Sequence, residues 1–444
     1  MLYKNIIDLI GNTPILEIDK KITGLKNINL YVKLELFNPF GSLKDRAALS
    51  MLKNNIKDIK EKGKTVIESS SGNTAKALQI LCSINDIKFK TITNRIKLNE
   101  TRNVLKIAGA EIEELPGISE CPDPSDPNDP IAYIERIVSN EPDKYYHTSQ
   151  YTNLDNPRIH YETTGKEIYN DIGNVDYFFG TLGTTGSSRG CIEFLREKNN
   201  ELKKVGIIAE KGDYIPGIRN KDEMNEVGIF EKDLYDDIVT VNSMEAIEYM
   251  LILNRKCGVL GGPTSGAAFK GTLDYLRKID DKCETNSNAV FIACDRVEWY
   301  VSYIEKRRPD IFDSSIKKDT VRNLTDKDLE YAKTLEFNEF DEWIKNNNPI
   351  IIDLRGNLAY KNAHVKGSIN ITDSYFEDVI ENGTPFSKEN NILLICATGD
   401  KSFKFSAFLN KKGINCYSLT GGMMNLRDNE YPLERNLRIE NNIW

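Results

Sequence analysis

The sequence is poor in the residues and spacings that support a metal centre or a disulfide framework. Its 444 residues include three histidines and eight cysteines. The histidines, His147, His160 and His364, share no metal-ligand spacing with each other or with the cysteines, so no metal site is expected. No two cysteines form a CxxC pair, and scattered cysteines in a chain of this length indicate free thiols.

Long apolar runs, basic clusters and targeting segments are also absent. No apolar run is long enough to span a bilayer, and the N-terminal stretch lacks the apolar core and cleavage site of a signal peptide. The net charge is −8 and no long basic run is present, which argues against nucleic acid as the main partner. We therefore expect a cytoplasmic protein with no membrane or nucleic-acid partner.

The order of apolar and polar segments predicts two α/β domains. Up to about residue 310, short apolar strand-like runs alternate with segments of helical period, which is typical of a parallel sheet covered by helices. Residues 311–330 are polar and charged and predict a linker. The alternation then restarts, so residues 331–444 predict a second, smaller α/β domain.

Four loops of the first domain lie where a strand leads into a helix, which is where open parallel sheets bind ligands. They contain Lys44, the run Ser69–Thr74, the glycine-rich run 180–190, and the run Gly261–Gly266. One serine would be enough to cap a helix, whereas several hydroxyls and free backbone N–H groups form an anion site. Two anion sites and one loop lysine predict a phosphorylated carbonyl cofactor that is joined to the lysine. Pyridoxal phosphate meets both requirements.

Several motifs of this domain, in order, resemble the cysteine synthase and cystathionine β-synthase family. They are IGNTPIL (10–16), VKLELFNPFGSLKDRAA (32–48), ESSSGNTAKAL (68–78) and GGPTSGAA (261–268). The resemblance implies a tryptophan synthase β-subunit-like fold, fold type II, and a homodimer. It implies that Lys44 forms the internal aldimine with pyridoxal phosphate and that Asn73 binds the ring hydroxyl. The remaining implied contacts are the phosphate (Gly183, Thr184, Thr185, Gly186, Ser187), the pyridine nitrogen (Thr264, with Ser265 as the less favoured choice) and the substrate carboxylate (Ser70, Ser71, Gly72, Thr74, Gln150).

The implied reaction is β-replacement or β-elimination on cysteine or an O-activated serine through an α-aminoacrylate, with Lys44 as the base. Cysteine synthesis and cysteine desulfhydration share this intermediate, so both stay open. Phe40, Thr185 and the run CDRVEWY (294–300) depart from the family pattern, and the run 117–136 has no counterpart in it. These departures leave the leaving group and the nucleophile undecided.

In the second domain, Cys396 follows an apolar strand and precedes a loop and a helix. Backbone amides and a helix N-terminus would stabilise its thiolate, while the alternative is a buried structural cysteine. The runs 350–371 and 417–426 resemble the rhodanese family. That resemblance implies that Cys396 carries a persulfide. It also implies an active-site loop formed by Ala397, Thr398, Gly399, Asp400, Lys401 and Ser402.

The combined prediction is an enzyme of sulfur amino-acid metabolism that uses a small amino-acid substrate and a sulfur donor. Cys396 would deliver sulfane sulfur to the aminoacrylate or accept sulfur released from cysteine. One alternative is a relay protein that passes sulfur from cysteine to a protein acceptor. Another is a serine or threonine dehydratase, which the Asn-Pro-x-Gly-Ser-x-Lys-Asp-Arg loop disfavours.

Overall fold

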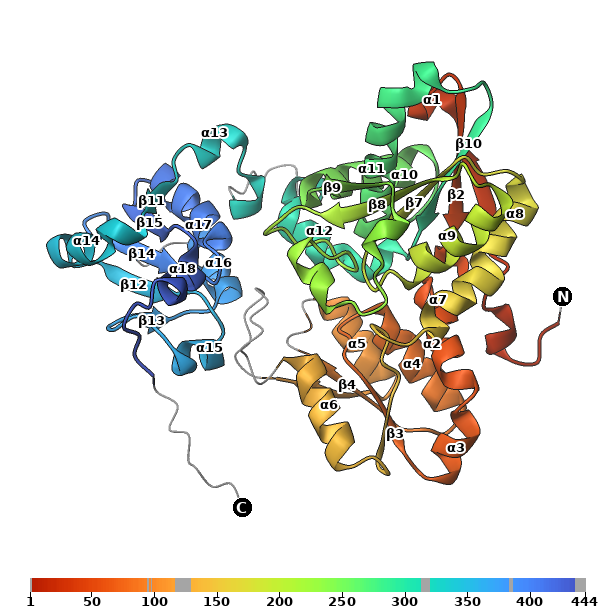
Figure 1. Cartoon of the computed structure of the whole chain (residues 1–444), viewed down its shortest axis with the longest axis horizontal. Helices are drawn as coiled ribbons and strands as arrows, with labels where there is room; N and C mark the ends of the chain where they lie inside the picture. The colour runs from red at the N-terminus through yellow and green to blue at the C-terminus, as the bar shows by residue number, and fades with distance from the viewer. Residues whose placement is uncertain are drawn as a thin grey trace. The chain divides into compact units, whose positions relative to one another are not determined.

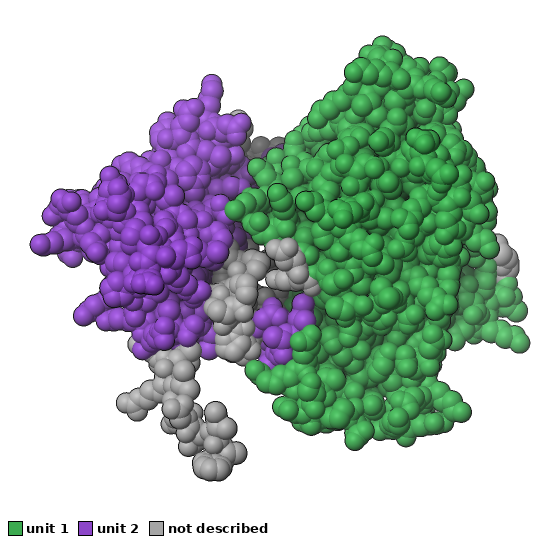
Figure 2. Space-filling model, viewed as in Figure 1, with its two compact units in different colours: residues 1–114, 134–306 green, residues 115–133, 307–444 purple. Residues whose placement is uncertain are grey.

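The computed structural model describes residues 2–93, 96, 98–115, 129–312, 320–382 and 386–435. The chain divides into two compact units, residues 1–114 with 134–306 and residues 115–133 with 307–444 (Figure 2). Both are built from sheets and helices, which confirms the predicted α/β class (Figure 1). Among the described residues, no helix is both long and apolar enough to cross a membrane.

The larger sheet of the first unit has six strands in the order β1-β2-β10-β7-β8-β9. Only β1 is antiparallel to its neighbour; the other pairs are parallel. The central strand β10 pairs through Ala289 with Leu30 on one side and with Tyr177 on the other. The strands are β1 (Ile15–Ile18), β2 (Ile28–Leu34), β7 (Tyr177–Thr181), β8 (Lys203–Ala209), β9 (Asp237–Val241) and β10 (Ser287–Ala293).

The smaller sheet of the same unit has four parallel strands in the order β5-β4-β3-β6. They are β3 (Thr65–Glu68), β4 (Phe89–Thr93), β5 (Glu111–Glu114) and β6 (Tyr145–His147). The helices of this unit include α1 (Lys20–Thr23), α2 (Lys44–Lys53), α3 (Ile56–Glu61), α4 (Asn73–Ile84), α5 (Asn99–Ile107), α6 (Pro130–Asn140), α7 (Asp155–Ile159), α8 (Lys166–Ile172), α9 (Gly186–Lys198), α10 (Ser243–Lys256), α11 (Pro263–Ile279) and α12 (Val301–Arg307). Of the run 117–136, residues 130–136 lie in α6 and 117–128 lie outside the described residues.

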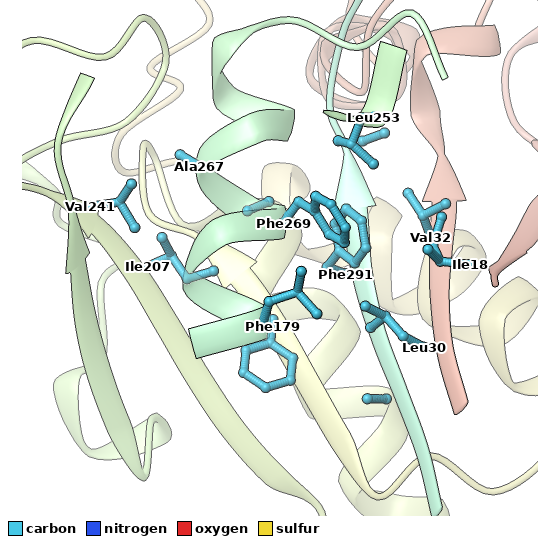
Figure 3. Close-up of a cluster of buried hydrophobic side chains, with 14 of the residues drawn as sticks. Ile18, Leu30, Val32, Phe179, Ile207, Val241, Leu253, Ala267, Phe269 and Phe291 are labelled. Atoms are coloured by element: carbon cyan, nitrogen blue, oxygen red, sulfur yellow. The ribbon is translucent and has the colours of Figure 1, made fainter. Parts of the chain in front are cut away.

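One of the apolar clusters of the first unit forms where α11 packs on the six-stranded sheet (Figure 3). Phe269 of α11 stacks on Phe291 of β10 with ring centroids 5.6 Å apart. Gly266 allows α10 to approach α11 closely, because a Cβ at this position would collide with the carbonyl of Ala246. The close packing fixes the N-terminus of α11, which carries Thr264, against the carboxyl edge of the sheet.

The second unit contains a five-stranded parallel sheet in the order β11-β15-β14-β12-β13. Alternate residues of the central strand β14 enter two different apolar clusters, as expected for a strand buried on both faces. The elements are α13 (Asp326–Leu329), β11 (Lys333–Leu335), α14 (Phe340–Asn347), β12 (Ile350–Asp353), α15 (Asn357–Asn362), β13 (Ile369–Asn370), α16 (Asp373–Asn382), β14 (Ile392–Ile395), α17 (Asp400–Lys411), β15 (Cys416–Leu419) and α18 (Gly422–Asp428).

Part of the segment predicted as a linker, 311–330, has regular structure. A short 3-10 helix spans Val321–Asn323 and α13 follows it. Val321 is buried in the apolar core of the second unit, and Leu324 packs against that core. These two apolar residues attach the end of the segment to the second unit, while 313–319 lie outside the described residues.

Candidate active site

Lys44 is the first residue of α2, at the carboxyl edge of the larger sheet. The loop before it is tied to the end of β10, because Leu43 N donates to Cys294 O at 2.9 Å. Asp45 closes the loop by accepting hydrogen bonds from Phe40 N at 2.7 Å and Ser42 Oγ at 3.2 Å. These contacts fix the backbone position of Lys44.

The Lys44 side chain is only partly exposed, and its amine has no hydrogen-bond or ion-pair partner among the described residues. Burial lowers the pKa of the Lys44 ammonium, while the negative charges that Cys294 and Asp295 can carry oppose the shift. A lowered pKa raises the fraction of neutral amine, which is the form that attacks a carbonyl group. Lys44 therefore has the environment of a reactive lysine.

The second loop joins β3 to α4 and brings together most of the predicted carboxylate-binding residues. Thr74 Oγ1 donates to Gln150 Oε1 at 2.9 Å, and Gln150 Nε2 donates to Ser69 O at 2.8 Å. Ser70 Oγ accepts from Gly72 N at 3.3 Å and from Ala75 N at 3.2 Å. Ser71 and Gly72 lie on the same loop. The first-turn N–H groups of α4 have no intrahelical acceptor, so this loop could hold a carboxylate.

Asn73 contacts two residues that the sequence analysis did not assign to the site. Its Nδ2 donates to Asp295 Oδ2 at 2.7 Å and to Tyr300 OH at 3.1 Å, and Tyr300 OH itself donates to Asp295. Burial raises the pKa of the Asp295 carboxyl to about 6. A sequence signal for Asp295 exists: it is an acidic residue directly after a buried strand, within the run CDRVEWY (294–300) that departs from the family pattern.

Lys76, one turn along α4, lies close to the same carboxyl group. Lys76 is only 3% exposed, and its ammonium lies 3.8 Å from the centroid of the Trp299 ring. Burial lowers the pKa of Lys76 to about 8, against the attraction of Asp45 and Asp295. Lys76 therefore places a cation near two buried carboxyl groups below the Lys44 loop.

The third loop, from β7 into α9, fits a phosphate group. Thr185 is the N-cap of α9 with φ of 64°, and its buried Oγ1 has no hydrogen-bond partner among the described residues. Thr184 Oγ1 accepts from Asn156 Nδ2 at 3.1 Å, and Ser187 lies in the first turn of the helix. A Cβ on Gly186 would collide with Asn156, and one on Gly183 with the carbonyl of Gly217. A glycine-lined helix N-terminus with an unused hydroxyl fits the predicted cofactor phosphate.

The two hydroxyls at the start of α11 have different partners. Thr264 Oγ1 donates to the carbonyl of Pro216, whereas Ser265 Oγ accepts from Cys294 N at 3.1 Å. Both side chains are buried. Ser265 thus ties α11 to the end of β10, and Thr264 keeps lone pairs that could accept a further hydrogen bond.

A buried charge network anchors the start of α2. Arg46 pairs with Glu35 at 2.8 Å and with Glu167 at 2.6 Å, and Lys33 pairs with Glu167 at 2.8 Å. Burial alone would raise the pKa of Glu35, but Arg46 lowers it to about 2. The network fixes the helix that carries Lys44, and nothing in the local sequence had pointed to it.

In the second unit, Cys396 ends β14 and its side chain turns into the predicted loop. Its Sγ accepts from Gly399 N at 3.1 Å and lies 3.4 Å from Ser402 Oγ. Gly399 has φ of 91°, which favours glycine. Thr398 Oγ1 donates to Asp400 at 2.7 Å, and Lys401 pairs with Asp373 at 2.7 Å. The loop from Ala397 to Ser402 therefore surrounds the sulfur with backbone and hydroxyl groups.

The other cysteines of the core have environments that keep the thiol protonated. Burial raises the pKa of Cys82 and of Cys294 to about 12, and it raises the pKa of Cys191 and Cys416 as well. Among the described residues, no group of three histidine, cysteine or acidic side chains could hold a metal ion. Cys121 lies outside the described residues.

Comparison with protein families divides the chain in the same way. Residues 6–295 match the family model described as "Pyridoxal-phosphate dependent enzyme", and residues 336–429 match the one described as "Rhodanese-like domain". The chain is 33% identical over 299 residues to cysteine synthase B of Salmonella typhimurium, covering 66% of this chain and 93% of that protein. It is 28% identical over 404 residues to cystathionine beta-synthase of Saccharomyces cerevisiae, covering 83% of this chain and 73% of that protein.

Solved structures give a consistent result for the first unit. A hydrogen sulfide-producing enzyme from Fusobacterium nucleatum superposes with a TM-score of 0.60 and 32% sequence identity, covering 68% of this chain and 99% of that one. An O-acetyl serine sulfhydrylase from Entamoeba histolytica superposes with a TM-score of 0.60 and 26% identity, covering 72% of this chain and 94% of that one.

Proposed function

Because the chain belongs to the family of pyridoxal-phosphate-dependent enzymes and is a cysteine synthase-like member with a rhodanese-like domain, we propose that its first unit performs β-replacement or β-elimination on cysteine or an O-activated serine. The observation that carries this proposal is Lys44, whose amine has no hydrogen-bond or ion-pair partner among the described residues, in a unit that also contains a glycine-lined helix N-terminus and a hydroxyl-rich loop. Pyridoxal phosphate is the cofactor of this family.

The bound cofactor supplies an electron sink that makes the Cα–H bond of an amino-acid substrate acidic. Lys44 Nζ would hold the cofactor and then remove the Cα proton, a task suited to an amine of lowered pKa. Thr185 Oγ1 and the first-turn N–H groups of α9 would hold the phosphate. Both N–H groups of Asn73 are used by Asp295 and Tyr300, which leaves its Oδ1 for the cofactor's ring hydroxyl.

The loop before α4 would hold the substrate carboxylate. Thr74 Oγ1 donates to Gln150 Oε1, so a bound carboxylate would replace Gln150 as the acceptor of the Thr74 hydroxyl hydrogen. It would also accept from the first-turn N–H groups of Asn73 and Thr74, since the Ala75 N–H already donates to Ser70 Oγ. Ser70, Ser71 and Gly72 would complete this site. Thr264 would present its Oγ1 lone pairs at the pyridine nitrogen, because its hydroxyl hydrogen is donated to the Pro216 carbonyl. A hydroxyl there gives a weaker charge interaction than a carboxylate would.

For the second unit, we propose that Cys396 carries a persulfide and supplies sulfur to the first unit. Release of the outer sulfur of a persulfide as sulfide is a reduction, and a small thiol serves as the reductant. For each sulfide released, two thiol groups are oxidised to one disulfide. Collecting sulfide from cysteine as sulfane sulfur would instead need an oxidant. Since both units share one chain, released sulfide would form at a raised local concentration.

Separate incubation of the purified protein with O-acetylserine plus sulfide, O-phosphoserine plus sulfide, and cysteine alone tests the proposal. Cysteine formation with either serine ester shows β-replacement, and release of sulfide with pyruvate from cysteine shows β-elimination. The Lys44→Ala variant should do neither. If the wild-type protein with bound cofactor does neither, the proposed function is wrong.

A further inference from the structure

Cys396 lies at one end of a chain of buried hydroxyl groups. Its Sγ is 3.4 Å from Ser402 Oγ, and Ser402 Oγ is 2.7 Å from Ser418 Oγ. All three residues are at most 1% exposed, so their hydrogen bonds form away from bulk water, where each bond is electrostatically stronger. Ser402 belongs to the predicted active-site loop, whereas Ser418 lies on β15, the strand that pairs with β14. Ser418 therefore reaches Cys396 from a neighbouring strand, through Ser402.

The available hydrogens limit the bonds that can coexist when Cys396 is ionised. A thiolate sulfur has no hydrogen and can only accept, and Sγ accepts from Gly399 N at 3.1 Å. A serine hydroxyl has one hydrogen to donate and two lone pairs that accept. If Ser402 donates its hydrogen to Sγ, its oxygen is left as an acceptor, and the Ser418 hydroxyl at 2.7 Å is a donor for it. The bonds of the ionised site then run in one direction, from Ser418 to Ser402 to Cys396.

The carbonyl of Gly399 is the acceptor that competes for the Ser402 hydrogen. It lies 3.0 Å from Ser402 Oγ and 3.4 Å from Ser418 Oγ. Gly399 O already accepts from Phe403 N at 3.0 Å, so it keeps a partner when the Ser402 hydrogen turns to the sulfur. A hydrogen bond that Ser402 accepts from Ser418 polarises the Ser402 O–H group and strengthens the bond that it donates.

Resting on the proposed sulfurtransferase role of Cys396, we infer that Ser418 is a positioning residue for the thiolate: it donates its hydrogen to Ser402 Oγ, so that Ser402 donates its own to Cys396 Sγ. Since the thiolate is the nucleophile, this arrangement raises the fraction of reactive sulfur at neutral pH. Ser418 acts through Ser402, so its effect should vanish when the Ser402 hydroxyl is removed.

Alkylation of the full-length protein by iodoacetamide, a small uncharged electrophile, reports the thiolate without requiring sulfur transfer. Peptide mass spectrometry follows the rate at Cys396 across a range of pH, and the midpoint of the profile gives the pKa of the thiol. Ser402→Ala should raise this midpoint by about one to two pH units, as expected for losing a hydrogen bond to a charged group. Ser418→Ala should raise it by about half a pH unit, which makes alkylation below the midpoint about threefold slower.

The double variant separates an effect through Ser402 from a direct one. Ser402→Ala should have the same midpoint with and without Ser418→Ala, because Ser418 then has no bond left to strengthen. Ser418→Thr keeps the hydroxyl in a residue that suits a strand, and should have the wild-type midpoint. If Ser418→Ala does not fold, Ser418→Cys replaces it, because a thiol is a weaker donor and should also raise the midpoint.

Ser406→Ala is the matched control. Ser406 lies one turn further along α17, is fully buried, and donates to Cys416 O of β15 at 2.8 Å. This variant removes a buried hydroxyl from the same contact between α17 and β15, but not from the chain that ends at Cys396. It should therefore leave the midpoint unchanged.

Ionisable side chains on the elements around Cys396 can also affect its thiol, and every variant leaves them unchanged. They are Asp353 and Arg355 at the end of β12, Asp373 of α16, and Asp400, Lys401 and Lys404 of α17. A difference between two profiles therefore reports the hydroxyl groups.

An unchanged midpoint in folded Ser418→Ala would overturn the inference, as would an equal rise in Ser406→Ala or an additive rise in the double variant. Persulfide formation on wild-type Cys396 from cysteine persulfide is measured separately by mass spectrometry. Failure of that reaction would overturn the sulfurtransferase role itself, whereas the alkylation profile decides the role of Ser418.

Discussion

At the residue scale, Asp295 connects the pH of the solution to the cofactor site. Its pKa of about 6 means that the carboxyl group is ionised at neutral pH and becomes protonated as the pH falls through 6. Protonation removes the charge that holds Asn73 and Tyr300. We expect the absorbance of the bound cofactor to titrate with a midpoint near pH 6, and this step should be missing in Asp295→Asn.

Lys76 gives the matched variant for this titration. Its cation stabilises the ionised form of Asp295, so Lys76→Met should move the midpoint to higher pH. A methionine keeps much of the apolar contact with Trp299 while removing the charge. A midpoint that is unchanged in Asp295→Asn would show that another group is being titrated.

Thr74 carries the predicted contact with the substrate carboxylate. A hydrogen bond to a charged group contributes about 1.5–3 kcal/mol, so Thr74→Ala should weaken amino-acid binding about ten- to a hundredfold. Spectral titration of the bound cofactor with amino acid measures this loss. Thr74→Ser keeps the hydroxyl and should stay close to wild type; equal affinity of the alanine variant would refute the assignment.

At the scale of elements, the buried pair Glu35–Arg46 holds the start of α2. The folded-state pKa of Glu35 is about 2 against an ordinary 4.5, so the ionised form is stabilised by folding. This contribution, about 3 kcal/mol from the size of the shift, is present above pH 4.5 and is lost as the pH falls towards 2. Glu35→Gln should therefore lower the free energy of unfolding of the first unit by about 3 kcal/mol at pH 7.

Hydrogen-exchange mass spectrometry on peptides of the first unit in urea measures this change without interference from the second unit. The control is Glu61→Gln, which alters an exposed helical pair, Lys57 with Glu61, and should change stability by less than about 0.5 kcal/mol. A Glu35→Gln variant as stable as this control would mean that the buried network does not anchor α2.

The sequence predicted the loops of the site better than the contacts between them. The positions of Lys44, Asn73 and Thr185 at helix starts could be predicted because each follows a strand-like run and precedes a helix, while their roles stay predictions. The partners of Asn73 could not be predicted, because Asp295 and Tyr300 are more than 200 residues away and follow a strand of the other sheet. The same holds for Glu167, which reaches Arg46 across 121 residues.

The segment 311–330 also makes contacts with distant residues that its local sequence does not predict. Its polar composition predicted a linker, but Val321 and Leu324 pack on the second unit, since two apolar residues are enough to attach a short segment. Periodicity over so few residues carries little information. The positions that escaped prediction are those set by long-range packing.

At the scale of the whole molecule, the two units have separate apolar cores, so we expect their chemistry to be separable. Cys396→Ser should abolish persulfide formation from a persulfide donor and leave conversion of O-acetylserine or cysteine by the first unit intact. Mass spectrometry and a sulfide assay measure the two activities in one sample. A persulfide on Cys294 or Cys121 with Cys396 unmodified would refute the assignment of Cys396.

A homodimer also stays a prediction at this scale, and sedimentation of the purified protein checks it. For a dimer, sedimentation equilibrium would give a molecular mass twice the monomer mass of 50.5 kDa. A monomer at the concentrations used for activity would contradict this part of the account.

The most direct test of the central claim is chemical fixation of the cofactor on Lys44. Borohydride treatment of the purified yellow protein, followed by proteolysis and mass spectrometry, should place the reduced cofactor on the peptide that contains Lys44. Lys44→Ala should lose the reducible label, while Lys76→Met should retain it on Lys44. Reducible label on any other lysine, or its survival in Lys44→Ala, would contradict the account.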